Sequence, residues 1–176
     1  MPLMRVTHQR GAITETQKAR LAEELTAALL IGEVGADTPA GRAVAYVLFD
    51  EVDPKTSWFV GGKPDLEAPK AGRFLVDIVY PFGSTPQAEK SALHAAINDI
   101  TLTLDIDAAS GRGTDWVMIR DVADGNWGAG GNTVGIAEIN QALNGVPERK
   151  NYFEPLIAAQ RRMRAALGYP AGAARS

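Results

Sequence analysis

The spacing of apolar and polar residues predicts a strand followed by a helix at the start of the chain. Residues 3–9 are rich in apolar residues and run into a Gln-Arg-Gly turn, a pattern typical of a strand. A helix is predicted to follow from Thr14, which forms a capping-box sequence with Gln17. Apolar residues then recur at the spacing of one helix face, at Leu21, Leu25, Ala28 and Leu29.

A second strand and a hairpin complete this first unit. The composition of residues 34–41 predicts a loop, and residues 43–49 form an apolar run, rich in β-formers, that predicts a buried strand. Residues 58–62, Trp-Phe-Val-Gly-Gly, predict a small hairpin. Residues 63–72 contain prolines and mixed charge, which indicates a linker.

The same order of elements begins again after the linker. Residues 74–80 predict a strand, and Ser84 or Thr85 is expected to cap a helix that has Pro86 at its start. The apolar stripe of this helix is Leu93, Ile97, Ile100 and Leu104. Residues 116–122 predict the strand that follows it.

Short sequences recur at matching places in the two units. The Trp-x-x-Gly-Gly sequence of residues 58–62 appears again at residues 127–131, and the helix start at residues 14–18 resembles residues 85–90. We interpret the chain as a tandem β-α-β duplication. Because a crossover helix joins parallel strands, the duplication predicts an α+β fold built from β-α-β units. Its sheet has four strands, with two helices on one face, and an oligomer is an economical way to cover the other face.

This organisation predicts one domain and a helical tail. The domain covers residues 2–133, with repeats at 2–62 and 73–133 joined by the linker. Residues 134–176 form a C-terminal extension. A short helix is predicted at 136–143, and a longer amphipathic helix is marked by Phe153, Leu156, Ile157, Gln160, Met163 and Leu167. We expect the extension to cover the open sheet or to contact a neighbouring subunit.

Composition narrows the classes of function. The 176 residues carry a formal net charge of −3, so no electrostatic feature favours nucleic acid or an anionic membrane as a partner. The absence of cysteine excludes disulfides, thiolate catalysis and cysteine-ligated zinc, and a count of only two histidines disfavours a histidine-rich metal site. No apolar run is long enough to span a membrane and the N-terminus lacks a secretory signal, so we expect a cytoplasmic protein.

Pro2 is the candidate catalytic residue. A small residue after the initiator favours removal of Met1, which leaves Pro2 with a free secondary amine. An α-amino group has a pKa of roughly 7.7–8.0, a prolyl amine starts higher, and burial or a nearby cation brings the value towards neutrality. An amine with such a pKa can act as the general base that enolisation needs. The alternative is that Met-Pro is an ordinary start of a protein.

The chain resembles the tautomerase superfamily, which includes oxalocrotonate tautomerase, macrophage migration inhibitory factor, malonate semialdehyde decarboxylase and the cis-chloroacrylic acid dehalogenases. The resemblance covers about residues 2–133. It is carried by Pro2, by Gly11 at the end of the first strand, by the helix start at residues 14–18, by Ala-Tyr-Val-Leu-Phe-Asp-Glu at residues 45–51 and by Phe-Val-Gly-Gly at residues 59–62. The resemblance implies a tautomerase fold like that of macrophage migration inhibitory factor, and a homotrimer. It also implies a catalytic proline in an apolar pocket near a subunit boundary and arginines that hold a substrate carboxylate.

The sequence departs from that family at the arginines. Oxalocrotonate tautomerase has an arginine after its first-strand glycine, whereas Gly11 is followed by alanine and preceded by Arg10. The place of that family's second arginine is taken by Tyr46, and the paired arginines of the dehalogenases and decarboxylases are absent from residues 80–84. The place of the dehalogenase histidine is occupied by Leu29.

Six further residues are candidates for binding the substrate: Arg10, Arg73, Arg120, Tyr46, Tyr80 and Trp127. The arginines stand near predicted strand ends, where a guanidinium could hold a carboxylate, and the alternative for each is an exposed ion pair that contributes little. The tyrosines could donate to an enolate oxygen or belong to the core. The tryptophan could form a wall of the pocket or pack within its hairpin.

These observations together predict an isomerase. The hypothesis is a proline-dependent tautomerase that interconverts the keto and enol forms of a small 2-oxo acid, with Pro2 as general base and acid and with no cofactor. One alternative is a lyase or hydratase of the same superfamily that uses a protonated Pro2. Another is a non-catalytic trimeric binding protein, which retention of Met1 would favour because an acylated proline nitrogen is not basic.

Overall fold

The protein folds around one four-stranded mixed sheet. The computed structural model describes residues 2–66, 73–104, 116–143 and 146–168. The strands of the sheet are β1 (Leu3–Gln9), β2 (Tyr46–Val52), β5 (Phe74–Pro81) and β6 (Trp116–Val122), in the spatial order β2-β1-β5-β6. β1 is parallel to β2 and β5 is parallel to β6, whereas β1 and β5 are antiparallel. The two predicted β-α-β units therefore lie side by side, related by an approximate two-fold axis between β1 and β5.

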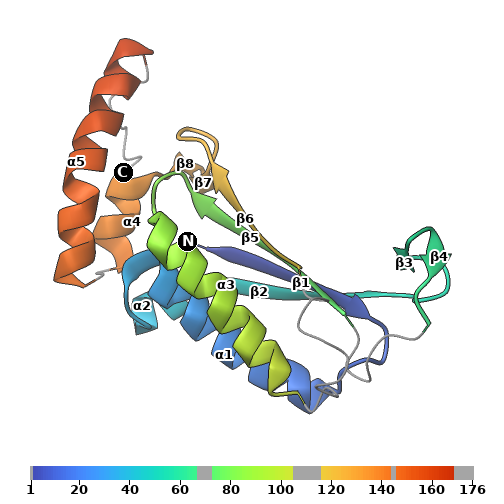
Figure 1. Ribbon diagram of the computed structural model, residues 1–176. Helices are drawn as coiled ribbons and strands as arrows, with labels where there is room; N and C mark the ends of the chain where they lie inside the picture. The colour runs from blue at the N-terminus through green and yellow to red at the C-terminus, as the bar shows by residue number, and fades with distance from the viewer. Residues whose placement is uncertain (1, 67–72, 105–115, 144–145, 169–176) are drawn as a thin grey trace.

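Two long helices cover one face of this sheet (Figure 1). They are α1 (Glu15–Val34) and α3 (Gln87–Leu102), and each connects the parallel strands of its own unit. A small hairpin follows each unit: β3 (Phe59–Val60) pairs with β4 (Lys63–Pro64), and β7 (Gly128–Ala129) pairs with β8 (Asn132–Thr133). The predicted α+β fold is confirmed.

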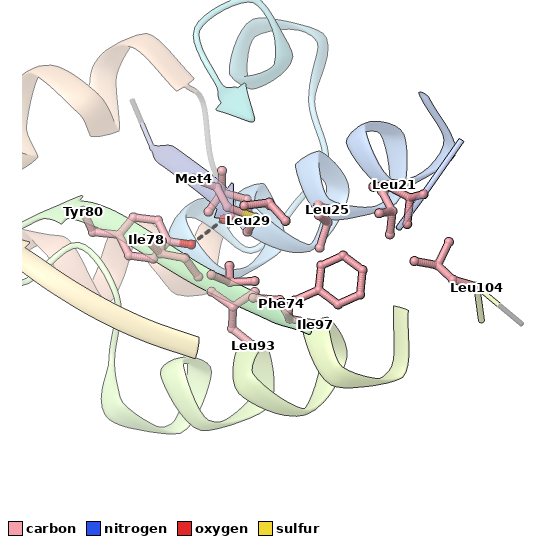
Figure 2. Packing of buried hydrophobic residues seen from close by; sticks show 13 residues of the cluster. Met4, Leu21, Leu25, Leu29, Phe74, Ile78, Tyr80, Leu93, Ile97 and Leu104 are labelled. Atoms are coloured by element: carbon pink, nitrogen blue, oxygen red, sulfur yellow. Dashed lines mark hydrogen bonds between the residues drawn. The ribbon is translucent and has the colours of Figure 1, made fainter. Parts of the chain in front are cut away.

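The core lies between the sheet and these helices, as Figure 2 shows. Alternate residues of the two central strands point towards the helices and are buried, among them Met4, Phe74, Ile78 and Tyr80. They pack against the apolar faces of α1 and α3, which supply Leu21, Leu25, Leu29, Leu93 and Ile97. Each fully buried side chain of this kind contributes roughly 1.5–3 kcal/mol relative to an exposed one.

The two long helices begin differently. The Thr14 side chain accepts a hydrogen bond from the backbone N–H of Gln17 at 3.2 Å, and the Gln17 side chain accepts one from the Thr14 N–H at 2.8 Å, as the capping-box prediction requires. The prediction for α3 is wrong, because its N-cap is Pro86 and no side chain caps it. Ser84 and Thr85 are buried before the helix begins, and their hydroxyl oxygens lie 3.5 Å from each other.

Three segment boundaries differ from the prediction. The predicted strand at 43–49 is displaced to Tyr46–Val52, and it is not buried: because β2 is an edge strand with one uncovered face, Tyr46 is 59% exposed. The predicted loop at 34–41 contains the start of a short helix, α2 (Pro39–Arg42), capped by Thr38. β4 takes up the first residues of the predicted linker, and residues 67–72 lie outside the described ranges.

The C-terminal extension packs at one end of the sheet. It comprises α4 (Ile136–Leu143) and α5 (Pro147–Ala166), drawn in orange and red in Figure 1. α4 contacts α2, and the Val146 N–H donates to the carbonyl of Val34 at the end of α1, at 3.2 Å. Among the residues that the structure describes, none of the extension covers the open face of the sheet, so its described part does not take the first of the two predicted roles.

Within the described ranges, none of the helices combines the length and the apolar character needed to cross a membrane.

Candidate active site

Pro2 lies buried at the start of β1, at the end of the sheet where β5 finishes. The next residue, Leu3, pairs with Tyr46 on one side and with Val79 on the other. The Pro2 carbonyl accepts a hydrogen bond from the Tyr46 N–H at 3.2 Å, which fixes this proline to the first residue of β2. Since Pro2 shares its side of the strand with buried Met4, its ring faces the helix layer.

Tyr80 is the neighbour of Pro2 on β5. The antiparallel register that pairs Leu3 with Val79 places Tyr80 opposite Pro2, on the buried side of the sheet. The Tyr80 hydroxyl donates to the carbonyl of Leu29 on α1 at 2.8 Å, the dashed line in Figure 2. Burial raises the pKa of this phenol well above its ordinary value, and the charge of Glu33 adds to the rise. Tyr80 is therefore a neutral donor at physiological pH.

Glu33 brings a carboxyl group to the same end of the sheet. It occupies the last turn of α1, where it is completely buried. Burial raises the pKa of this carboxyl, and the positive charges of the amino terminus and of Arg149 oppose the rise. Sequence analysis missed Glu33, although a single acidic residue within the run Leu-Leu-Ile-Gly-Glu-Val was a signal of a buried carboxyl.

Arg149 approaches this group from the C-terminal extension. It lies in the first turn of α5 and is only 6% exposed. Its Nη2 donates to the carbonyl of Gly32 at 3.2 Å and lies 3.6 Å from Oε1 of Glu89 on α3. The guanidinium also lies over the ring of Tyr152, 5.9 Å from its centroid. Sequence analysis missed this residue too, because it stands in an ordinary polar run.

Two of the predicted arginines lie at the opposite end of β1. Arg10 follows the last residue of that strand, 3.8 Å from Asp53, and Arg73 precedes β5 and donates to Asp65 at 2.5 Å. A strand of this length separates them from Pro2 by about 20 Å, at roughly 3.3 Å per residue. One chain does not bring Arg10 or Arg73 together with Pro2.

Two other candidates lie on the open face of the sheet, and a third lies in a hairpin. Arg120 forms a bidentate ion pair with Asp77, which raises the pKa of its guanidinium. Tyr46 is exposed on the same face. Trp127 is half-buried and its carbonyl accepts the N–H of Val134 at 2.9 Å, at the end of the sheet that also holds Pro2.

Two hollows are lined by residues of the helices and of the segments that flank them. One, of about 400 Å³, runs between α1 and α3 over a floor of small and apolar side chains that includes Ala28, Gly32 and Leu93. The other, of about 380 Å³, adjoins Arg149 and Tyr152. Pro2 lines neither of them. The described residues include no cluster of three or more acidic or histidine side chains that could hold a metal ion.

Comparison with known proteins identifies the fold. No family model and no curated protein sequence matches the chain. Among solved structures, it is similar to an asymmetric trimer of wild-type fused 4-OT, with 23% identity and a TM-score of 0.59 over 74% of this chain and 94% of that one.

It is also similar to a member of the cis-3-chloroacrylic acid dehalogenase family, with 16% identity and a TM-score of 0.61 over 85% of this chain and 97% of the other. Macrophage migration inhibitory factor from Toxoplasma gondii matches at 13% identity and a TM-score of 0.54, over 75% and 99% of the two chains. The chain thus has the tautomerase fold in its fused, tandem form.

Proposed function

We propose that this chain is an enzyme of the tautomerase type, in which the amine of Pro2 moves a proton between the keto and enol forms of a small 2-oxo acid. The observation that carries the proposal is the burial of Pro2 beside Tyr80, at the end of a sheet whose fold is that of the fused 4-OT proteins. Removal of Met1 is required, because an acylated proline nitrogen has no basic lone pair.

The surroundings of Pro2 suit a base that works near neutral pH. Burial disfavours the protonated form of an amine and so lowers its pKa towards the working pH. The free amine takes a proton from the carbon next to the substrate carbonyl, the charge moves onto the carbonyl oxygen, and the protonated amine returns the proton to give the other tautomer. Hydrogen-bond donors near that oxygen stabilise the enolate. This chemistry needs no cofactor.

A homotrimer supplies what one chain lacks. The open face of the sheet exposes apolar residues of both edge strands, Tyr46, Leu48, Trp116 and Met118. Burial of such a face by other copies is favourable. Three of the similar fused 4-OT structures are described as trimers. In such an assembly, Arg10 or Arg73 of one copy serves the Pro2 site of the next and binds the carboxylate of its substrate.

Glu33 favours a second candidate on the same scaffold. A carboxylate close to the amine stabilises its protonated form and raises its pKa, the opposite of the effect of burial. A protonated Pro2 is the acid needed by a lyase or hydratase, the activity class of the dehalogenase family whose member is similar to this chain.

The experiment compares the parent protein with Pro2→Ala in the ketonisation of an aryl enolpyruvate, after intact mass has verified that Met1 is absent. We expect the variant to lose at least tenfold in kcat/KM, a change of about 1.4 kcal/mol in the activation barrier. Pro64→Ala, which alters an exposed proline of the first hairpin, is the matched control and keeps the parent rate. An inactive parent without Met1, or an unaffected Pro2→Ala, contradicts tautomerase activity and directs the assays to hydration, decarboxylation and binding.

A further inference from the structure

We propose that the C-terminal extension is part of the catalytic site, with Arg149 as a positioning residue that holds Glu33 in place beside Pro2. The proposal rests on the proposed function, since it assigns Arg149 a role in proton transfer at Pro2. It concerns a residue outside both β-α-β repeats, so the repeats alone do not complete the site.

The first step of the argument is the burial of Arg149. An arginine is almost never buried unless its charge is paired, yet this guanidinium is 6% exposed although it lies in the first turn of the last helix. Glu89 lies 3.6 Å from it, a distance at the edge of an ion pair. Its hydrogen bond is to the carbonyl of Gly32, the residue before Glu33. The buried guanidinium therefore lies against the C-terminal end of α1.

The second step is the end of α1 itself. The last carbonyls of a helix have no partner within the helix and carry a partial negative charge, which a nearby cation stabilises. α1 has no basic residue in its last turn. The extension supplies hydrogen-bond donors to two carbonyls at this helix end: the Arg149 guanidinium donates to the carbonyl of Gly32, and the Val146 N–H donates to that of Val34.

The third step connects this helix end with Pro2. The Tyr80 hydroxyl, opposite Pro2 in the sheet, donates to Leu29 in the same region of α1. The packing leaves no space there, because a Cβ added at Gly32 would lie 3.1 Å from the Tyr80 hydroxyl oxygen. The last turns of α1, to which Arg149 donates, thus pack against the residue that lies opposite Pro2 in the sheet.

The fourth step is the effect of the Arg149 charge on the protonation of Glu33. The groups that act on the Glu33 carboxyl are the amino terminus, Arg149 from α5 and the phenol of Tyr80 from β5, and Glu89 of α3 faces Arg149. Arg149 opposes the rise in the pKa of Glu33 that burial produces. It therefore favours the carboxylate form, which in turn favours the protonated form of the prolyl amine.

The test measures the full-length Arg149→Met, Arg149→Lys and Arg149→Gln variants in two ways. A ¹³C NMR titration follows the side-chain carboxyl of Glu33, and a pH profile of kcat/KM follows the ketonisation of the aryl enolpyruvate. Arg162→Met, which alters an exposed arginine of the same helix, is the matched control.

We expect Arg149→Met to titrate Glu33 at a higher pH than the parent. Because a neutral Glu33 no longer stabilises the protonated prolyl amine, we expect the acidic limb of the kcat/KM profile to move to lower pH. We expect Arg149→Lys, which keeps the charge, to recover most of the Glu33 titration, and Arg162→Met to match the parent in both measurements.

Two results overturn the proposal. In the first, Arg149→Met is folded but titrates Glu33 and follows pH as the parent does, which shows a purely structural contact. The second applies if Arg149→Met does not fold. In that case the proposal fails if the pH at which Glu33 titrates in folded Arg149→Lys is no closer to the parent value than it is in folded Arg149→Gln. The failure of the proposed function has a different signature, because Pro2→Ala then leaves the rate unchanged while the NMR titration still reports on Arg149 and Glu33.

Discussion

At the scale of single residues, the burial of Glu33 makes stability depend on pH. Its pKa in the folded protein is raised above the ordinary value of 4.5, and burial is the main cause. Below the ordinary value both folded and unfolded chains hold the proton, so the group has no effect. As the pH rises from there through the raised pKa, the unfolded chain releases the proton first, and the folded state loses stability relative to it.

Glu33→Gln removes this contribution, because glutamine does not titrate. The free energy of unfolding of the variant, measured by urea denaturation, is therefore expected to increase relative to that of the parent between pH 4.5 and pH 7. Glu154→Gln, at an exposed position of α5, is expected to leave the pH dependence unchanged. Parallel curves for the parent and Glu33→Gln would show that the folded state does not raise this pKa.

The residues of the site also show what the sequence could not reveal. Pro2 is predicted as the catalytic residue because its chemistry follows from its place in the chain, and that role stays a prediction. The contact of Arg149 with the end of α1, which carries Glu33, depends on the packing of α5 against that helix, and no local pattern encodes it. For Tyr80 the sequence left two roles open, a donor to an enolate or a core residue, and in the structure it is buried in the core and its hydroxyl donates to Leu29.

At the scale of elements, the starts of α1 and β2 illustrate two kinds of sequence signal, one local and one that depends on tertiary contacts. The capping box of α1 was predictable because both of its hydrogen bonds are made by residues within one turn. The position of β2 was not, because its apolar run starts before the strand does, and pairing with β1 decides where the strand begins. Local chemistry thus predicted the long helices and the central strands but not the short helix α2, and tertiary contacts set the edges.

The capping box of α1 has a measurable stability. Thr14→Ala removes the oxygen that accepts the Gln17 N–H, and we expect it to lower the free energy of unfolding by about 1 kcal/mol. Thr14→Ser keeps that oxygen and is expected to stay within a few tenths of a kcal/mol of the parent. Chemical denaturation of the two variants measures the difference. Equal losses for alanine and serine would mean that the methyl group of Thr14, rather than its hydrogen bond, stabilises this end of the helix.

At the scale of the whole molecule, the two faces of the sheet are unequal. One face is covered by α1 and α3, whereas the other exposes Trp116 to 67% and Met118 to 43%. Ion pairs on the open face, Arg5 with Asp50 and Arg120 with Asp77, neutralise its charges pair by pair. An apolar face whose charges are already paired is suited to bury itself against copies of the same chain.

This face gives the prediction for the assembly. Light scattering after size-exclusion chromatography is expected to give the mass of three chains for the parent. Met118→Lys places a charge on the open face in the middle of the edge strand β6, where association would have to desolvate it, so we expect this variant to dissociate. Met163→Lys introduces the same charge at a methionine that is 50% exposed on α5, and we expect it to remain a trimer.

A monomeric parent would refute the homotrimer, and a trimeric Met118→Lys would place the interface on another surface. If Met163→Lys dissociates instead, the C-terminal extension contacts the neighbouring subunit, which is the second role that its sequence predicted.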